Sequence, residues 1–284
     1  MADTVLLTGA TGNIGKPLVQ TLLSQGRSIK VLARDTDQIP SQPGVEAVKG
    51  DLADPTSLVQ AFRGVDRLFL LTPLVPDMVK LGLNGVRAAK AAGIKHVVRS
   101  SGLGAMEEGI AIARWHRAIE KELEASGMAW TFLRPNSFFQ NLFFQAMAIK
   151  GQSAFYTSLG EGKISLVDTR DVAQVAARAL TEPGHEGRAY DLTGPEALNG
   201  VELAAILSRV LSRTISCVVI SEEASKQAMA QMNMPSVIVD GLAELDAIGR
   251  AGYAAALSPD LSKLLGRAGR SFEQFARDHR AAFE

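Results

Sequence analysis

The sequence predicts an α/β fold in which helices cover both faces of a doubly wound parallel sheet, with a smaller α/β lobe at the C-terminal side. Three observations lead to this prediction. Short apolar runs alternate with longer amphipathic stretches through the first half of the chain. The runs are apolar at nearly every position, which is typical of strands buried on both faces. This alternation stops after Arg134, where a different region begins.

The elements of the first half follow from these runs and from their flanking residues. Strands are predicted at TVLLT, SIKVLA, VEAVK, RLFLL, HVVRS and WTFLR, which begin near residues 4, 28, 45, 67, 96 and 130. Helices are predicted near 15–25, 55–63, 77–92 and 110–126. Asp54-Pro55 indicates a helix start, with a capping carboxylate and a proline in the first turn. Glycines that favour a helix end follow the four helical stretches, namely Gly26, Gly64, Gly93 and Gly127.

The second half is less regular. Residues 137–150 are rich in aromatic side chains, and the following run GQSAFYTSLGEGK is loop-like. Short strands are predicted at ISLV, RAYDL and TISCVVI, and helices near 170–181, 199–211, 221–232 and 271–283. We expect these elements to form a smaller lobe, with some segments returning to the first domain.

Composition limits the classes of function. The chain has 284 residues, of which 46% are hydrophobic, and its 30 basic side chains equal its 30 acidic ones in number. This balance argues against nucleic acid or an anionic membrane as the main partner. The single cysteine, Cys217, fits a reducing compartment and a buried packing role. Without a targeting segment or an apolar stretch of about 20 residues, we expect a soluble cytoplasmic protein, monomeric or homodimeric.

The stretch GATGNIG, Gly9 to Gly15, indicates a dinucleotide site. It follows the first strand and opens the first helix, where free backbone N–H groups bind a pyrophosphate. Gly9 permits the turn, Gly12 lets the phosphates approach, and Gly15 lets helix and strand pack closely. Thr11, Asn13 and Ile14 complete this cofactor-binding turn. Residues 1–135 are therefore predicted to be an NAD(P)-binding Rossmann domain, and 136–284 a substrate-binding lobe.

The end of the second strand indicates which coenzyme is bound. In VLARD the position that usually holds a carboxylate for the ribose 2′-hydroxyl of NAD is Arg34. An arginine there favours the 2′-phosphate of NADPH. Asp35 follows directly and leaves NAD as the alternative, and a solvated surface arginine is a third interpretation.

Other strand ends are expected to meet the same coenzyme, because open α/β sheets bind ligands at their carboxyl edge. Asp51-Leu52 is expected to meet the adenine, and Thr72-Pro73 the ribose and nicotinamide. Ser100-Ser101 is expected at the floor of the active site, and Pro135-Asn136 behind the nicotinamide. For each pair a merely structural turn is the alternative.

These motifs, together with E-x-x-L-x-x-SG ending at Gly127, TFLRPNSFFQN, VDTRDVA, YDLTGPE and LSKLLGR, resemble the NmrA-like atypical short-chain dehydrogenase/reductase family. The resemblance covers nearly the whole chain and is greatest to the bacterial NADPH-dependent quinone, triarylmethane-dye and azo-dye reductases. It implies a Rossmann domain with a small C-terminal lobe. The family also includes regulators that bind a dinucleotide without redox chemistry, so both a reductase and a regulator stay open as functions.

The Tyr-x-x-x-Lys pair of ordinary short-chain dehydrogenases is absent. Four residues after Tyr156, Tyr190 and Tyr253 stand Gly160, Gly194 and Leu257. Aligned with the family pattern, His116 occupies the lysine position and Ile112 the tyrosine position. His116 is the candidate catalytic group because a histidine titrates near neutrality, and a packed or surface histidine is the alternative.

The region after the sixth strand is expected to bind an aromatic substrate. Phe139 and Phe143 are predicted on one helix face, Tyr156 at the mouth of the site, and Met229 and Met232 in an adaptable apolar lid. Core packing is the alternative for the phenylalanines and the methionines. The sequence thus predicts an NADPH-dependent reductase of quinones, azo dyes or similar aromatic acceptors, without flavin or metal. A non-catalytic NADP-sensing regulator is the rival hypothesis.

Overall fold

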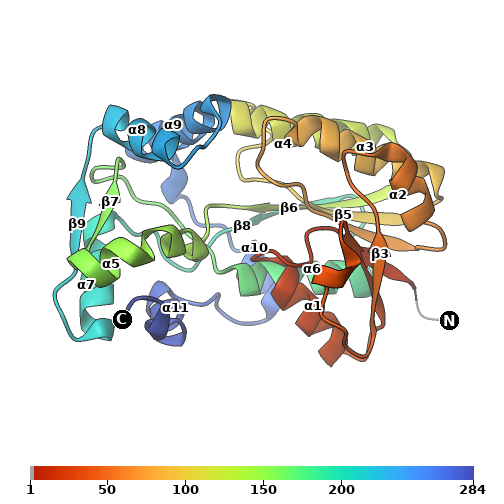
Figure 1. The fold of residues 1–284 in the computed structure, drawn as a ribbon, viewed down its shortest axis with the longest axis horizontal. Coiled ribbons are helices and arrows are strands. Elements are labelled where there is room, and N and C mark those ends of the chain that lie inside the picture. The colour runs from red at the N-terminus through yellow and green to blue at the C-terminus, as the bar shows by residue number, and fades with distance from the viewer. Residues whose placement is uncertain (1–2) are drawn as a thin grey trace. The chain divides into compact units, whose positions relative to one another are not determined.

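The structure, a computed structural model, describes residues 3–284 and divides into two units. Unit 1 contains the residues up to Arg134 together with Val172–Asp191, and unit 2 contains Pro135–Asp171 and Leu192–Glu284. The chain therefore returns to the first unit once before it completes the second. Figure 1 shows the course of the chain.

Unit 1 is built on a seven-stranded sheet with the strand order β3-β2-β1-β4-β5-β6-β8. Its strands are β1 (Val5–Leu7), β2 (Ile29–Ala33), β3 (Val45–Lys49), β4 (Arg67–Leu70), β5 (His96–Ser100), β6 (Ala129–Pro135) and β8 (Arg188–Leu192). The pairs from β3 through β1 to β6 are parallel. This order, with crossovers on both sides of β1, is the Rossmann fold predicted from the sequence.

Helices cover both faces of this sheet (Figure 1). On one face lie α2 (Pro55–Ala61), α3 (Met78–Ala91) and α4 (Ala111–Ala125), and on the other α1 (Gly15–Ser24) and α6 (Thr169–Thr181). A short 3₁₀ helix, η1 (Thr36–Gln38), follows β2. The core beneath α2, α3 and α4 includes Phe62, Val86, Ile119 and Phe132, all fully or almost fully buried. Burial on both faces explains why the strands are apolar throughout.

Local signals in unit 1 agree with the sequence prediction. The Asp54 side chain accepts a hydrogen bond from the Thr56 N–H at 3.0 Å, and Pro55 occupies the first turn of α2. The four predicted helix-ending glycines all have positive φ, between 69° and 82°. These caps satisfy backbone groups that the helices leave open at their ends.

Unit 2 has a two-stranded parallel sheet, β7 (Ala154–Thr157) with β9 (Ser216–Val219), surrounded by helices. The helices are α5 (Ala146–Gln152), α7 (Gly200–Leu211), α8 (Glu222–Gln231), α9 (Ser236–Arg250), α10 (Asp260–Leu265) and α11 (Phe272–Asp278). The 3₁₀ helices are η2 (Phe139–Gln145), η3 (Tyr253–Ala255) and η4 (Arg280–Ala282). Its core joins Phe139, Phe155, Leu207 and Phe275.

Four sequence predictions for the second half need correction. RAYDL is a strand, β8, but it belongs to the sheet of unit 1. ISLV makes only isolated bridges, Ile164 with Leu198 and Val167 with Phe138. β7 lies inside the run predicted as a loop, and α9 was not predicted at all. For RAYDL, ISLV and β7 the pairing partner lies far away in the sequence, whereas α9 packs on its neighbours α8 and η3.

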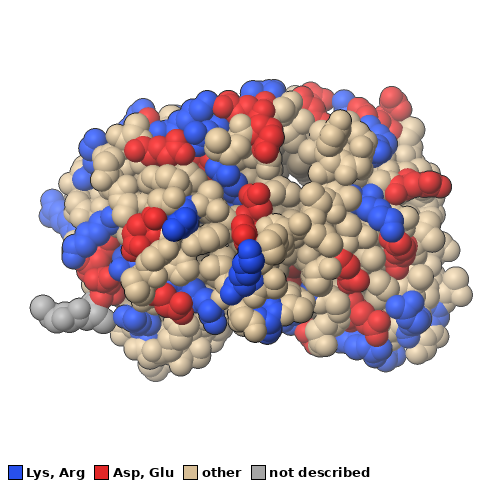
Figure 2. All heavy atoms as spheres, turned by 180° about the vertical axis from the view of Figure 1, so that it is seen from behind, with Lys and Arg blue, Asp and Glu red and all other residues tan. Residues whose placement is uncertain are grey.

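Acidic and basic side chains are interspersed on the face shown in Figure 2. Within residues 3–284 no helix is both long and apolar enough to cross a membrane. In the same range no cluster of three or more His, Cys, Asp or Glu side chains is arranged to hold a metal ion.

Candidate dinucleotide and active site

The glycine-rich turn after β1 has the geometry of an anion cradle. Gly9 has φ of +68°, and the Gly12 N–H donates to the Gly9 carbonyl at 3.0 Å. A Cβ atom on Gly15 would lie 2.1 Å from the Gly9 carbonyl oxygen, so only glycine fits there. A Cβ atom on Gly12 would meet only that oxygen, at 3.3 Å, and would otherwise project into open space. Gly15 therefore serves packing, and Gly12 leaves the surface of the turn free.

The turn opens a helix that no side chain caps. At the start of α1 there is neither a side-chain hydrogen bond nor an acidic residue in the first turn. Thr11, Gly12 and Asn13 are exposed, whereas Ile14 is buried in the core. Exposed N–H groups at a positive helix end are suited to a phosphate, so these residues fit the pyrophosphate of a dinucleotide. Ile14 offers its backbone only.

Thr8 joins this turn to the end of β4. Its hydroxyl donates to the Leu71 carbonyl at 2.8 Å and accepts from the Leu71 N–H at 2.8 Å. The Leu71 side chain approaches Gly9 so closely that a Cβ atom on Gly9 would lie 2.8 Å from it. Thr72 and Pro73 thus follow a residue that contacts the glycine-rich turn; Thr72 is half-buried and Pro73 is exposed.

The two candidates at the end of β2 differ in their partners. Asp35 caps η1: its carboxylate accepts from the Asp37 N–H at 3.1 Å and from Gln38 Nε2 at 3.0 Å. Arg34 is exposed, and within the described residues its guanidinium has no hydrogen-bond or ion-pair partner. The arginine is free for a ligand, while the carboxylate is engaged in the local turn.

The side chains of Asp51 and Leu52, the candidates for adenine binding, have mainly structural roles. One oxygen of the Asp51 carboxylate accepts from the Ala53 N–H at 2.9 Å. The Leu52 side chain is buried in the core, and its carbonyl accepts from Asn84 Nδ2 at 2.8 Å. Any contact of Leu52 with a ligand would therefore use its N–H group.

The serine pair after β5 is buried. The Ser101 hydroxyl donates to Glu120 Oε1 at 2.7 Å, and the Ser101 N–H donates to the Leu133 carbonyl at 2.7 Å. Ser101 was expected at the floor of the active site, but its hydroxyl is used to hold Glu120. Ser100 is also buried and belongs to β5 itself.

Glu120 is the centre of a buried ionic network that sequence reasoning missed. It accepts two hydrogen bonds from Arg134, at 2.9 and 2.7 Å, and one from Arg117 at 3.1 Å. A bidentate arginine contact is a strong form of ion pair. The sequence signal is Arg134, which stands among buried residues on β6, whereas Glu120 on α4 has charged neighbours and gives no signal.

His116 does not have the property that made it the catalytic candidate. Its ring on α4 packs against Gly102, where a Cβ atom would lie 2.9 Å from Cδ2. Burial, with a smaller contribution from the Arg99 charge, lowers the pKa of His116 to about 3. Its imidazole is therefore neutral at physiological pH, and the expectation that it titrates near neutrality is wrong.

Arg99 is the second group that the sequence prediction passed over. It lies on β5, where the run HVVRS was interpreted only as a strand, and its side chain is 1% exposed. Its guanidinium donates to the Thr72 hydroxyl at 3.0 Å and, more weakly, to the Leu70 carbonyl at 3.4 Å. Arg99 thereby links β5 to the end of β4.

The Asn136 side chain is engaged within unit 2. Its amide nitrogen donates to Ser165 Oγ at 2.9 Å and to the Ala254 carbonyl at 3.0 Å, and its oxygen accepts from the Ser137 N–H. Pro135 before it is buried. Asn136 therefore holds three segments of unit 2 together.

The predicted aromatic wall is a core in part. Phe139 is 1% exposed and packs on Phe272 and Phe275 with ring centroids 5.3 and 5.4 Å apart, so it is not an accessible substrate contact. Phe143 is half-buried against Phe275 and Phe283. The segment is a 3₁₀ helix, whose shorter turn changes which side chains share a face.

The remaining substrate candidates are accessible. Tyr156 on β7 is 36% exposed, and its hydroxyl donates to Gln152 Oε1 at 2.6 Å. On α8, Met229 is half-buried, and Met232 at the end of the helix is 61% exposed. These residues can contact a ligand, but they stay predictions.

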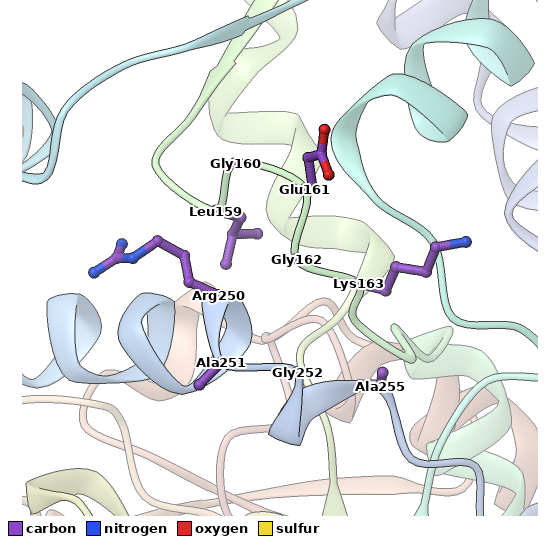
Figure 3. Close-up of a pocket in the computed structure, with 9 residues that line it drawn as sticks. All are labelled: Leu159, Gly160, Glu161, Gly162, Lys163, Arg250, Ala251, Gly252 and Ala255. Carbon is purple, nitrogen blue, oxygen red and sulfur yellow. The ribbon is translucent and has the colours of Figure 1, made fainter.

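Unit 2 also contains a cavity of about 480 Å³ that the sequence did not indicate. Figure 3 shows it between the loop Leu159–Lys163 and the end of α9, with the Lys163 and Arg250 side chains extending to opposite sides. Its size is in the range of small-molecule sites. None of the five predicted substrate contacts lines it. The one feature of the sequence that could have pointed to this cavity is the glycine-rich run LGEGK, residues 159–163.

Comparisons with known proteins show the family of the chain. The model of the NmrA-like family matches residues 1–270. An NAD(P)H azoreductase from Xenophilus azovorans is 44% identical over 98% of this chain and 99% of its own length. The NADPH-dependent quinone oxidoreductase of Escherichia coli, solved with NADPH, is 29% identical with a TM-score of 0.88, covering 98% of this chain and 99% of that one. The triphenylmethane reductase of Citrobacter sp. is 29% identical with a TM-score of 0.86, covering 99% of each chain.

Proposed function

Because the chain belongs to the NmrA-like family, as the sequence resemblance predicted, we propose that it is an NAD(P)H-dependent reductase of quinones, azo dyes or similar aromatic acceptors. The observation that carries the proposal is the three-glycine turn at the uncapped start of α1, in a chain that is 44% identical to an azoreductase over nearly its full length. The similar proteins named above are reductases, which favours this function over a regulator.

The coenzyme is NADPH in this proposal. Arg34 is exposed and unpaired within residues 3–284, while Asp35 is occupied in capping η1. A guanidinium binds a phosphate group with charge-assisted hydrogen bonds, so the 2′-phosphate would lie against Arg34. Gly9 to Gly15 would hold the pyrophosphate. The strand-end residues Asp51, Leu52, Thr72, Pro73, Ser100, Ser101, Pro135 and Asn136 stay proposed coenzyme contacts.

When bound, the coenzyme supplies a hydride. The chain has to position an acceptor beside it, and a quinone or an azo bond accepts hydride readily without prior protonation, so positioning supplies much of the rate. In this proposal the Tyr-x-x-x-Lys pair is dispensable, and the hydride passes directly to the acceptor without flavin or metal. Phe143, Tyr156, Met229 and Met232 are the proposed acceptor contacts.

The test of the coenzyme site uses two matched glycine variants. Gly12→Val should abolish NADPH binding, because a side chain would occupy the phosphate position while meeting only one protein atom within 4 Å. Gly109→Val is the control, since a Cβ atom there meets nothing within 4 Å. Fluorescence titration gives the dissociation constants, and circular dichroism confirms folding. A folded Gly12 variant with the parent's affinity would place the site elsewhere.

Coenzyme choice and activity are tested together. Arg34→Ala should weaken NADPH binding by about 1.5–3 kcal/mol and leave NADH binding nearly unchanged, because only NADPH carries the 2′-phosphate. Oxidation of NADPH with menadione and with an azo dye, followed by near-ultraviolet absorbance, tests the reductase function. Tight NADPH binding without reduction of any acceptor would favour the regulator instead.

A further inference from the structure

Arg99 is a buried cation without a carboxylate partner. Its side chain is 1% exposed, and within the described residues no acidic group lies within ion-pair distance of it. The nearby carboxylate, Glu120, is already bound by Arg134, Arg117 and Ser101. A buried charge that is not paired costs considerable free energy. Such a group calls for an explanation other than stability.

The shortest hydrogen bond of Arg99 is to the Thr72 hydroxyl. One terminal nitrogen donates to Thr72 Oγ1 at 3.0 Å, the other approaches the Leu70 carbonyl, and the buried Nε has no partner. The Thr72 oxygen therefore acts as an acceptor toward Arg99. Its own hydrogen is donated to no acceptor within residues 3–284, and the residue is half-buried. The hydroxyl is polarised by a cation and keeps a free donor.

Thr72 also lies where a reaction with a bound dinucleotide would occur. It follows Leu71, which contacts Gly9 and is tied to Thr8 by two hydrogen bonds. It stands at the carboxyl end of β4, next to β1 in the sheet. Ligands of doubly wound sheets bind at this edge.

We propose that the Arg99–Thr72 pair is the hydrogen-bond donor that stabilises negative charge on the acceptor during reduction, in place of the absent Tyr-x-x-x-Lys pair. Thr72 is the group that touches the acceptor, and Arg99 positions and polarises it. The inference rests on the proposed function. In the usual pair a lysine ammonium makes the tyrosine hydroxyl a stronger donor. Here the Arg99 guanidinium would do the same for the Thr72 hydroxyl, from a neighbouring strand.

The charge balance shows why such a donor is useful. The quinone takes up one hydrogen with two electrons from the reduced nicotinamide, which is thereby oxidised, and becomes a hydroquinone monoanion. The negative charge lies on oxygen until a proton from water neutralises it. A donor already aimed at that oxygen lowers the barrier, and removing one such donor typically costs about 10²–10³-fold in turnover.

The ionisation states are consistent with this role. Burial lowers the pKa of Arg99 to about 10, with Glu120 opposing the shift, so the guanidinium stays charged at neutral pH. His116 beside it is neutral, because burial and the Arg99 charge lower its pKa to about 3. Arg134 and Arg117 are paired with Glu120, and Arg117 also with Glu124. The pair therefore holds a single unshared positive charge.

The kinetic test compares two acceptors in four variants. With menadione, whose reduction creates an anion, Thr72→Val and Arg99→Met should lower turnover by about 10²-fold. With malachite green, a cation that becomes neutral on accepting hydride, the same variants should keep or exceed the parent rate. Thr72→Ser should retain most of the menadione rate, because it keeps the hydroxyl, and Arg99→Lys should give an intermediate rate. Equal losses with both acceptors would overturn the proposal.

Two readouts are independent of turnover. The NADPH dissociation constant should not change in Arg99→Met, because the guanidinium is buried behind Thr72; a large increase with unchanged menadione turnover would make Arg99 a support of the coenzyme site and overturn the proposal. Bound para-nitrophenol, whose phenolate absorbs visible light, should ionise at lower pH on the parent than on Arg99→Met. Failure of the proposed function would look different, since the parent would then bind NADPH but reduce neither acceptor.

Discussion

Two buried ionic groups, one in each unit, differ in how their charge is neutralised. In unit 2 the buried Asp171 accepts hydrogen bonds from Arg267 at 2.7 Å, from the Arg270 N–H at 2.6 Å and from the Arg270 guanidinium. In unit 1 the equally buried Arg99 has no carboxylate partner within the described residues and ends on a hydroxyl with a free hydrogen. The charge of Asp171 is neutralised by arginines of the same chain, whereas the charge of Arg99 is not neutralised by a carboxylate of the described residues.

The difference separates a structural role from a functional one. Asp171 holds the segment around Arg267 and Arg270 to the first turn of α6, and both of its carboxylate oxygens accept hydrogen bonds. Removing the Asp171 carboxylate takes a buried counter-charge away from two guanidinium groups. Arg99 makes only the hydrogen bonds to Thr72 and Leu70. Its replacement by an apolar side chain removes a buried charge that has no carboxylate partner within the described residues. The comparison predicts opposite consequences for stability.

The largest effect is expected for Asp171→Ala. It should lower the free energy of unfolding by about 3–5 kcal/mol, because it breaks an ion pair whose carboxylate is fully buried. Urea unfolding followed by far-ultraviolet circular dichroism measures this change. Asp278→Ala is the control, since that carboxylate pairs with Arg170 but is 30% exposed, and it should cost at most about 1 kcal/mol. Equal costs for the two variants would contradict the special position of Asp171.

The pH dependence of stability sharpens the same comparison. Burial acts to raise the pKa of Asp168, but the hydrogen bonds and charge of Arg170 outweigh it and lower that pKa below the ordinary 3.8. Its contribution to stability is therefore full above pH 3.8 and is lost as the pH falls through the lowered value. The slope for one proton is at most about 1.4 kcal/mol per pH unit. Asp168→Asn should remove this part of the slope in acid unfolding; an unchanged slope would assign it to other carboxylates.

The smallest effect on stability is expected for Arg99→Met. An unpaired buried cation replaced by an apolar side chain of similar length should leave the free energy of unfolding unchanged or raise it slightly. Both tryptophans, Trp115 and Trp130, lie in unit 1, so their fluorescence follows the relevant unfolding transition. A loss as large as that of Asp171→Ala would make Arg99 a structural ion and would break the comparison.

The sequence predicted unit 1 well because its signals are local. The six strands, their helices, the Asp54 cap and the glycines all depend on residues a few positions apart. Unit 2 depends on distant partners. β7 becomes a strand only through pairing with β9, and α9 contains Gly241 and Gly249, which lower helix propensity. Propensity cannot show either outcome.

The candidate site divides in the same way. The geometry of the glycine-rich turn agrees with its sequence, because the positive φ of Gly9 and the steric limit at Gly15 both arise within the motif. His116 and Phe139 were misjudged, because residue type does not show burial. Arg99 was missed because its role depends on burial without a carboxylate partner within the described residues. Only a structure displays that.

The discontinuity of unit 1 has a consequence for synthesis on the ribosome. Its sheet is complete only when β8 (Arg188–Leu192) has been made, and the first segment of unit 2, Pro135–Asp171, is translated between β6 and β8. At roughly 5–20 residues per second, β6 waits several seconds as an unpaired edge. An exposed edge strand invites wrong pairing. A nascent chain halted before β8 should therefore be a substrate for chaperones, whereas one released past it should not.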